Sequence, residues 1–99
     1  MITFTLQLPP LSDDQQFQLE EALLKVPRVD AFGMDAGTGL FTVSAAKETL
    51  RDLVATLYGW ASNYPGMLLQ TAVACGEEDA MILGKHSPND MIHYLAGCA

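Results

Sequence analysis

The first eight residues alternate between apolar and polar side chains. Every even position from Ile2 to Leu8 is apolar, and the odd positions between them are Thr or Gln. A period of two is typical of a strand with one buried face. Pro9 and Pro10 follow, and they end the predicted strand because proline cannot donate a hydrogen bond to a sheet.

The apolar spacing becomes helical after Ser12. The run Ser12-Asp13-Asp14-Gln15 has the form of a capping box with acidic residues in the first turn. A helix is therefore predicted from Ser12 to about Lys25, and Pro27 ends it. The predicted apolar stripe of this helix consists of Phe17, Leu19, Leu23, Leu24 and Val26.

The middle of the chain predicts a β-hairpin followed by a second helix. The segments 29–35 and 40–44 have strand-like composition, and the turn-rich tetrad Ala36-Gly37-Thr38-Gly39 separates them. A helix is expected to start at residue 45 or 46 and to end before the breaker Asn63-Tyr64-Pro65-Gly66. Its apolar residues recur at helical spacing, at Leu50, Leu53, Val54, Leu57 and Ala61.

The last third of the chain predicts two short strands and a short helix. The apolar run 67–75 suits a largely buried strand, residues 76–79 suit a turn, and residues 80–83 suit a short returning strand. Ser87 followed by Pro88 is typical of a helix start. This helix would turn Met91, Ile92 and Leu95 inward and end at Gly97.

The predicted order of elements is β-α-β-β-α-β, with an additional C-terminal strand and a short helix. The first six elements match a ferredoxin-like α+β sandwich, in which two helices cover one face of a four-stranded antiparallel sheet. With 99 residues, the chain is expected to form a single domain over 1–99. The second face of the sheet would be open, which makes it a natural place for a homodimer or another homo-oligomer to form.

Acidic residues outnumber basic ones by twelve to five, which gives a formal net charge of -7. Nucleic-acid binding requires Lys and Arg on the phosphates, so direct contact with nucleic acid or with an anionic membrane is not expected. The apolar run 67–75 is too short to span a bilayer. The acidic surplus suits a basic protein partner, although keeping the chain in solution would explain it equally well.

The two cysteines, Cys75 and Cys98, lie far apart in the sequence. Because Met1 leads straight into a strand pattern and no secretory signal opens the chain, a cytoplasmic location is expected, with both cysteines as free thiols. Cys75 would be buried and Cys98 exposed near the C-terminus. Neither cysteine has a metal-ligand spacing to the other, to His86 or to His93. No metal and no cofactor is therefore predicted.

Residues 29–57 resemble the middle of a heavy-metal-associated domain. The resemblance consists of the strand 29–35, the Gly37/Gly39 turn, the strand Leu40-Phe41-Thr42-Val43 and the amphipathic helix, and the element order over about residues 1–75 agrees. It implies the ferredoxin-like fold. In that family a Cys-x-x-Cys pair follows the first strand, whereas here that loop is the segment 9–14, which contains no cysteine. The resemblance therefore implies no soft-metal site for this chain.

Two groups of residues are the candidate binding residues. Tyr58, Trp60 and Tyr64 gather near the end of the second predicted helix, and such aromatic residues are enriched in interfaces and pockets. The acidic run Glu77-Glu78-Asp79 in a turn is the best candidate for contact with a basic partner. Covering the edge of the core would explain the aromatic group, and a solvated loop would explain the acidic run. No catalytic residue is assigned, because carboxylates adjacent in sequence form no dyad by themselves.

The favoured hypothesis is a small non-enzymatic binding protein that engages a protein partner, with an inhibitor or immunity-type role as one form. The alternative is a ferredoxin-like homodimer that binds a small molecule between the sheet and the helices, with an enzyme as one form. His86, Trp60 and Tyr64 would then be the pocket groups. A third hypothesis is metal or redox sensing through Cys75 and Cys98.

Overall fold

The alternating N-terminal segment forms β1 (Ile2–Gln7), the middle strand of a five-stranded sheet in the computed structural model. The apolar side chains of β1 are buried, while its Thr and Gln side chains are exposed or half-buried. The strand order is β2-β3-β1-β4-β5, and the neighbouring strands pair antiparallel. The structure describes residues 1–35, 37–38, 40–76 and 79–98.

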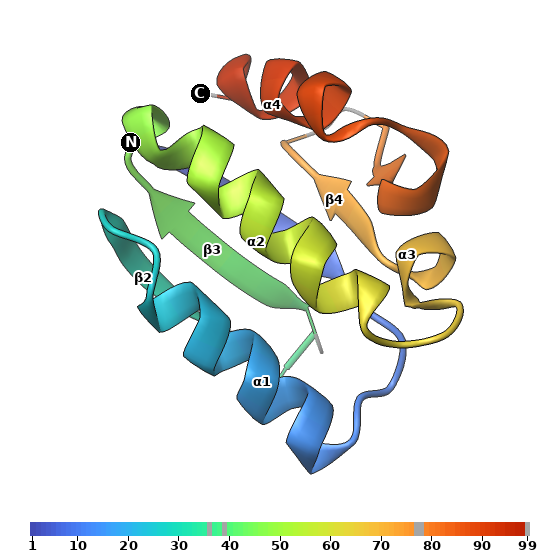
Figure 1. Cartoon of the computed structure of the whole chain (residues 1–99). Helices are drawn as coiled ribbons and strands as arrows, with labels where there is room; N and C mark the ends of the chain where they lie inside the picture. Colours follow the sequence, from blue (N-terminus) through green and yellow to red (C-terminus); the bar gives the residue numbers. More distant parts are fainter. Residues whose placement is uncertain (36, 39, 77–78, 99) are drawn as a thin grey trace.

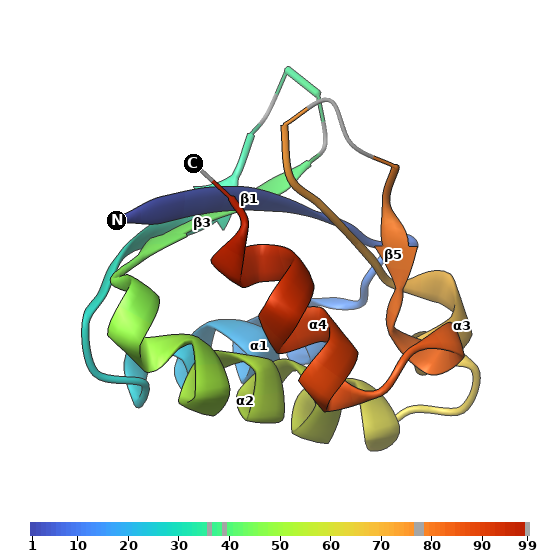
Figure 2. The ribbon, with the colours of Figure 1, turned by 90° about the horizontal axis from the view of Figure 1, so that it is seen from above.

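β1 is flanked by β3 (Phe41–Ala45) and by β4 (Ala72–Ala74), while β2 (Val29–Met34) and β5 (Met81–Ile82) form the edges. The helices lie on one face of this sheet (Figure 1; Figure 2). This arrangement is the predicted ferredoxin-like α+β sandwich. The additional strand and the short helix at the C-terminal end are present as predicted.

Two of the helices begin at the predicted caps. At the start of α1 (Asp13–Leu24), the Ser12 hydroxyl accepts from the Gln15 amide at 3.1 Å, and the Gln15 side chain accepts from the Ser12 amide at 2.9 Å. Ser87 and Asp90 repeat this capping box at the start of α4 (Pro88–Ala96). Polar side chains therefore satisfy the free amides at both helix starts.

A turn of 3-10 helix, η1 (Lys47–Thr49), leads into α2 (Leu50–Ser62), whose apolar stripe is buried as predicted. The layer between helices and sheet is filled by core side chains from both. The largest fully buried ones include Phe4, Phe41, Leu19, Leu23, Leu53, Leu57, Met91 and Leu95. In the described part of the chain, no helix has the length and apolar character needed to cross a membrane.

The predicted apolar stripe of α1 is only partly correct. Leu19, Leu23 and Val26 are buried, but Phe17 is 56% exposed and Leu24 is 67% exposed. At about 100° per residue, Phe17 and Leu24 lie on nearly the same side of the helix, roughly opposite to Leu19. The sheet covers only the Leu19 side, so the two other apolar side chains face outward.

The prediction of one continuous strand over 67–75 is wrong. The segment instead forms a single helical turn, α3 (Met67–Gln70), followed by the three-residue β4. Gly66, with a φ of 76°, adopts the left-handed conformation just before this turn, which glycine tolerates best. Met67 is buried and Leu69 is 60% exposed. A short apolar run does not distinguish a strand from a buried helical turn.

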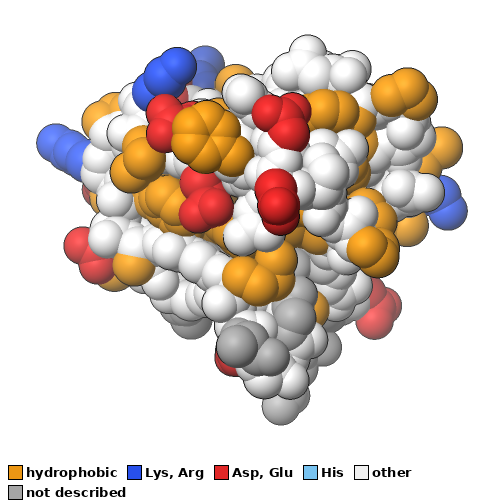
Figure 3. All heavy atoms as spheres, turned by 90° about the horizontal axis from the view of Figure 1, so that it is seen from below, with side chains coloured by type: hydrophobic (Ala, Val, Ile, Leu, Met, Phe, Trp, Pro, Cys, Tyr) orange, Lys and Arg blue, Asp and Glu red, His pale blue; other side chains and the backbone are white. Residues whose placement is uncertain are grey.

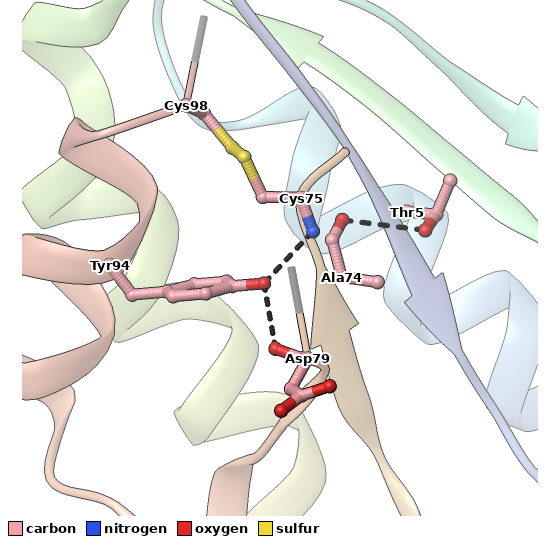
Figure 4. Close-up of a disulfide and its surroundings, with 6 residues drawn as sticks. All are labelled: Thr5, Ala74, Cys75, Asp79, Tyr94 and Cys98. Carbon is pink, nitrogen blue, oxygen red and sulfur yellow. Dashed lines mark hydrogen bonds between the residues drawn. A yellow bond between two sulfur atoms is a disulfide. The ribbon is translucent and has the colours of Figure 1, made fainter. Parts of the chain in front are cut away.

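The prediction of two free thiols is also wrong. Cys75, just after β4, forms a disulfide with Cys98, just after α4, and their Cα atoms are 5.9 Å apart (Figure 4). Cys98 is buried, not exposed, because α4 folds back over the sheet. The hydroxyl of Tyr94 lies beside this link, where it accepts from the Cys75 amide at 3.0 Å and donates to the Asp79 carbonyl at 3.1 Å. Residues 23 positions apart are thus joined at the end of the sheet.

Candidate functional site

A hollow of about 380 Å³ opens between α1 and α2, which run side by side in opposite directions (Figure 1). One wall comes from α1, where Asp14, Gln18 and Ala22 follow each other at intervals of four and therefore share one face of the helix. The other wall comes from α2 and the residues that follow it: Thr56, Gly59, Trp60, Asn63 and Tyr64. Ala22 and Gly59 add almost no side-chain volume to these walls, which leaves room between the helices.

The aromatic end of the hollow is held in a fixed position. Trp60 is 4% exposed, and its indole N–H donates to the backbone carbonyl of Gln15 at 3.1 Å. The ring of Tyr64 meets the indole edge-on, with 5.7 Å between the ring centres. This is the geometry that aromatic pairs prefer. The start of α1 therefore determines where the Trp60–Tyr64 pair lies.

The charge in the hollow is negative. Among the described residues that line it, Asp14 is the only one that carries a charge, and its side chain is exposed at the first turn of α1. Thr56, Gln18 and Asn63 supply neutral polar groups. The arrangement offers one carboxylate, two aromatic rings and several hydrogen-bonding groups at the same opening, which suits a cation better than an anion.

The surface on the α1 side of the molecule also combines apolar side chains with negative charge. Seen from below, that side shows hydrophobic groups among several carboxylates (Figure 3). On α1, the exposed Phe17 and Leu24 share a helix with Asp13, Glu20 and Glu21. We call this stretch the outer α1 surface. An apolar surface bordered by charged groups is typical of protein interaction sites.

Two of the predicted binding residues, Trp60 and Tyr64, line the hollow, whereas Tyr58 does not. The Tyr58 hydroxyl donates to the backbone carbonyl of His86 at 3.0 Å, which ties α2 to the segment before α4. Burial raises the pKa of the Tyr58 phenol above its ordinary value of 10.0, and the nearby Asp90 carboxylate raises this pKa further. Tyr58 therefore connects two elements of the fold.

Of the predicted acidic run at 77–79, the structure describes only Asp79. Glu77 and Glu78 lie outside the described residues. The backbone of Asp79 is held by Tyr94, its side chain is exposed, and it is not among the residues that line the hollow. The structure therefore does not bring Asp79 together with Trp60 and Tyr64.

Sequence analysis missed the α1 wall of the hollow and part of the α2 wall. Asp14 was interpreted only as a helix-start acid, while Gln18 and Asn63 were not singled out. The spacing of Asp14, Gln18 and Ala22 was a readable signal that they share a face. What the sequence does not show is that this face lies beside Gly59 of a helix far along the chain.

No described group of three or more His, Cys, Asp or Glu side chains gathers in a way that could hold a metal ion. His86 and His93 are both exposed, and neither lines the hollow. The hollow lies between two helices and not between the sheet and the helices, where core side chains fill the space. The hollow brings together one carboxylate, two aromatic side chains and neutral hydrogen-bonding groups.

Comparison with known proteins returns no match to a family model, to a curated protein or to a solved structure. The resemblance of residues 29–57 to heavy-metal-associated domains is thus limited to the order and pattern of elements. What can be said about function follows from this chain's own residues.

Proposed function

We propose that the protein is a non-enzymatic binding protein that engages a basic segment of a protein partner. In this proposal, one Arg or Lys side chain of the partner enters the hollow between α1 and α2. The observation that supports it best is the Asp14 carboxylate at the opening of a hollow that also holds the fixed Trp60–Tyr64 pair.

The chemistry of the hollow favours a cationic side chain. A guanidinium or ammonium group gains energy over the face of a Trp or Tyr ring and beside a nearby carboxylate. The side-chain oxygens of Gln18, Thr56 and Asn63 could accept hydrogen bonds from the several donors of an Arg. At about 380 Å³, the hollow has room for one side chain and sits at the small end of the range for ligand pockets.

The surroundings of the hollow favour a protein over a free cation. The net charge of -7 would attract a basic partner and raise the rate of encounter. Phe17 and Leu24 on the outer α1 surface would add apolar contact, which a small cation cannot use. An inhibitor or immunity-type role is one form that such binding could take.

The position of the only tryptophan makes the proposal directly measurable. Because Trp60 lines the hollow, its fluorescence should change when a side chain enters. The probes are short capped peptides with a central Arg or Lys, each compared with the same peptide carrying Gln at that position. We expect the basic peptides to shift the Trp60 emission and to bind more weakly as salt is added.

Two variants of the hollow test the same point. Asp14→Asn should weaken binding of the Arg peptide by about fivefold, the effect of about 1 kcal/mol for a partly exposed ion pair. Gly59→Leu should block the hollow, because a side chain there would meet nothing within 4 Å and would project into open space. Asp52→Asn and Ala55→Leu, on exposed positions of α2 outside the hollow, are the matched controls and should bind normally.

Equal binding of the Gln and Arg peptides, or unchanged binding by Gly59→Leu, would contradict the proposal. Binding of a free small molecule in the hollow, with no response to basic peptides, would favour the alternative of a small-molecule site. His86 would not belong to such a site, because it lies outside the hollow.

The cytoplasmic location was expected because no secretory signal opens the chain, and two free thiols were expected to go with it; the disulfide does not fit that second expectation. Disulfides persist mainly in oxidising environments. We therefore propose that the binding protein acts with Cys75 and Cys98 joined, which places the α4 end of the chain against the sheet.

A further inference from the structure

The exposed side of α1 alternates between acidic and apolar side chains. Phe17 and Leu24 are seven positions apart, which is two helical turns or about 10.5 Å along the axis. Glu20 and Glu21 come between them, one on each side of the line that joins the two apolar side chains. Asp13, one turn before Phe17, continues the same face. The outer α1 surface is therefore a single stripe in the order acid, apolar, acid, apolar.

This stripe lies opposite to the side of α1 that packs on the sheet. Leu19 is fully buried, whereas Phe17 and Leu24 are each more than half exposed. Hydrophobic groups stand among carboxylates when the molecule is seen from below (Figure 3). Covering Phe17 and Leu24 would remove apolar surface from water, a favourable step that the fold of the single chain does not provide.

We propose that the outer α1 surface binds an amphipathic basic helix of the protein partner. Charge selects this occupant. The carboxylates of Asp13, Glu20 and Glu21 border the apolar side chains, and positive charges placed opposite them attract the partner and fix its position along α1. The apolar side chains of the partner helix then cover Phe17 and Leu24.

The spacing of the stripe favours a helix over an extended segment. A helix laid along α1 places residues seven apart at about 10.5 Å, opposite Phe17 and Leu24, and the third and fourth residues after the first lie midway, opposite the two glutamates. An extended chain also covers about 10 Å in three residues, but its side chains alternate, so the first and the fourth point to opposite sides. The partner is thus expected to carry Lys or Arg midway between two apolar residues that are seven positions apart.

A second copy of this chain does not fit the stripe. If two α1 helices paired antiparallel about a two-fold axis, Phe17 of one copy would meet Leu24 of the other, but Glu20 and Glu21 would meet the same two glutamates of the other copy. Like charges brought together destabilise such a contact. Lys25 follows Leu24 at about 100° around the helix, so it lies off the stripe. The carboxylates also repel an anionic lipid surface.

This inference deepens the proposed function and rests on it in one respect, since the partner is the same basic protein. The hollow takes one side chain of that partner, and the outer α1 surface takes a helix. α1 has 12 residues, which makes it about 18 Å long. A contact along one face of such a helix is smaller than a standard interface, so a peptide that contacts only this surface should bind with a Kd between about 10 µM and about 1 mM.

Fluorescence anisotropy of a labelled peptide, titrated with the full chain, tests the proposal. The peptide is capped, is about 18 residues long so that it can form a helix, and carries two Arg midway between two Leu seven positions apart. A second peptide of the same composition has its Arg on the side of the helix opposite to its Leu. We expect the first peptide to gain helicity in circular dichroism on binding and to bind more weakly as salt is added. The second should bind about tenfold more weakly.

Two double variants separate the apolar part of the surface from its charge. Phe17→Ala/Leu24→Ala should weaken binding of the first peptide by about tenfold, because it removes both exposed apolar contacts. Glu20→Gln/Glu21→Gln should weaken it by about fivefold. Because all four side chains lie outside the fully buried core, circular dichroism should show that both variants fold.

Glu48→Gln/Asp52→Asn is the matched control for charge, since it removes two carboxylates at exposed positions of η1 and α2. It should bind the first peptide as the wild type does. Gly59→Leu separates this inference from the proposed function, because it blocks the hollow and leaves the outer α1 surface unchanged. It should lose the short Arg peptides and keep the helical one.

Loss of the helical peptide by Gly59→Leu would place that peptide in the hollow, which would overturn the inference and leave the proposed function standing. No binding at about 1 mM, or equal binding of the two peptides, would overturn it as well. So would unchanged binding by a folded Phe17→Ala/Leu24→Ala variant. Self-association of the wild type that this variant abolishes, measured by sedimentation velocity, would assign the surface to a second copy instead.

Discussion

The indole of Trp60 and the carbonyl of Gln15 are joined by a hydrogen bond of 3.1 Å that links the end of α2 to the first turn of α1. These residues are 45 positions apart, and Trp60 and Asp14, the neighbour of Gln15, both line the hollow. The site and the packing of the two helices thus depend on the same contact. Changes at Trp60 should be visible in stability as well as in binding.

Trp60→Phe should lower the free energy of unfolding by about 1 to 3 kcal/mol, because it removes a part-buried hydrogen bond and some buried ring surface. Urea denaturation followed by circular dichroism measures this loss without needing the tryptophan signal. Ser62→Ala, at an exposed position on the same helix, should stay within about 0.5 kcal/mol of the wild type. A Trp60→Phe variant as stable as Ser62→Ala would show that the contact contributes little.

The disulfide should stabilise the fold by about 3 kcal/mol, as estimated from the loop that 23 positions of separation close. Reducing agent should therefore lower the Tm of the wild type, whereas the double variant Cys75→Ala/Cys98→Ala should not respond to it. The native protein should also resist alkylation until it is reduced. Modification of both cysteines in the folded, unreduced protein would contradict the pairing.

Two glycines should respond to alanine in opposite directions. At Gly84, a new Cβ would lie 2.8 Å from the Leu69 side chain and 3.1 Å from the backbone of Leu68. Because the Leu68 backbone would have to move, Gly84→Ala should cost about 1 to 3 kcal/mol. Gly59→Ala, inside α2 with open space around it, should add about 0.5 to 1 kcal/mol of stability. Thermal unfolding should show a lower Tm for Gly84→Ala and a higher Tm for Gly59→Ala than for the wild type.

Tyr58 should make stability depend on alkaline pH. Burial, with a smaller effect of Asp90, raises the pKa of the folded phenol above the unfolded value of about 10. A raised folded pKa means that the neutral phenol stabilises the fold below pH of about 10, and that this contribution is lost as pH rises through the folded pKa. Tyr58→Phe should therefore lose less stability than the wild type between about pH 9 and pH 11. Parallel pH profiles would contradict the assignment.

The sequence predicted the elements whose pattern is local. Three features can be read from neighbouring residues alone: the period-two run of β1, the capping boxes at Ser12 and Ser87, and the apolar stripe of α2. The ferredoxin-like order of elements followed from them. The prediction failed where the outcome depended on a partner element. Phe17 looked like a core residue because apolar residues on α1 occupy two opposite sides, and only contact with the sheet chooses between them.

The candidate site was predictable only in part for the same reason. Trp60 and Tyr64 stood out by residue type, but Asp14, Gln18 and Asn63 became site residues only when α1 and α2 were placed side by side. The pairing of Cys75 with Cys98 likewise required α4 to fold back so that its C-terminal end reaches the end of β4, and no spacing in the sequence indicates that.

The disulfide between Cys75 and Cys98 should hold the protein together after proteolytic cleavage of the backbone inside its loop. β5 and α4 lie inside the loop that it closes, as does Lys85, which is exposed and is the last Lys or Arg of the sequence. Trypsin cleavage after Lys85 would therefore divide the backbone into residues 1–85 and 86–99 without separating the two pieces. The nicked protein would keep the mass of the whole chain plus one water, and α4 would leave only on reduction.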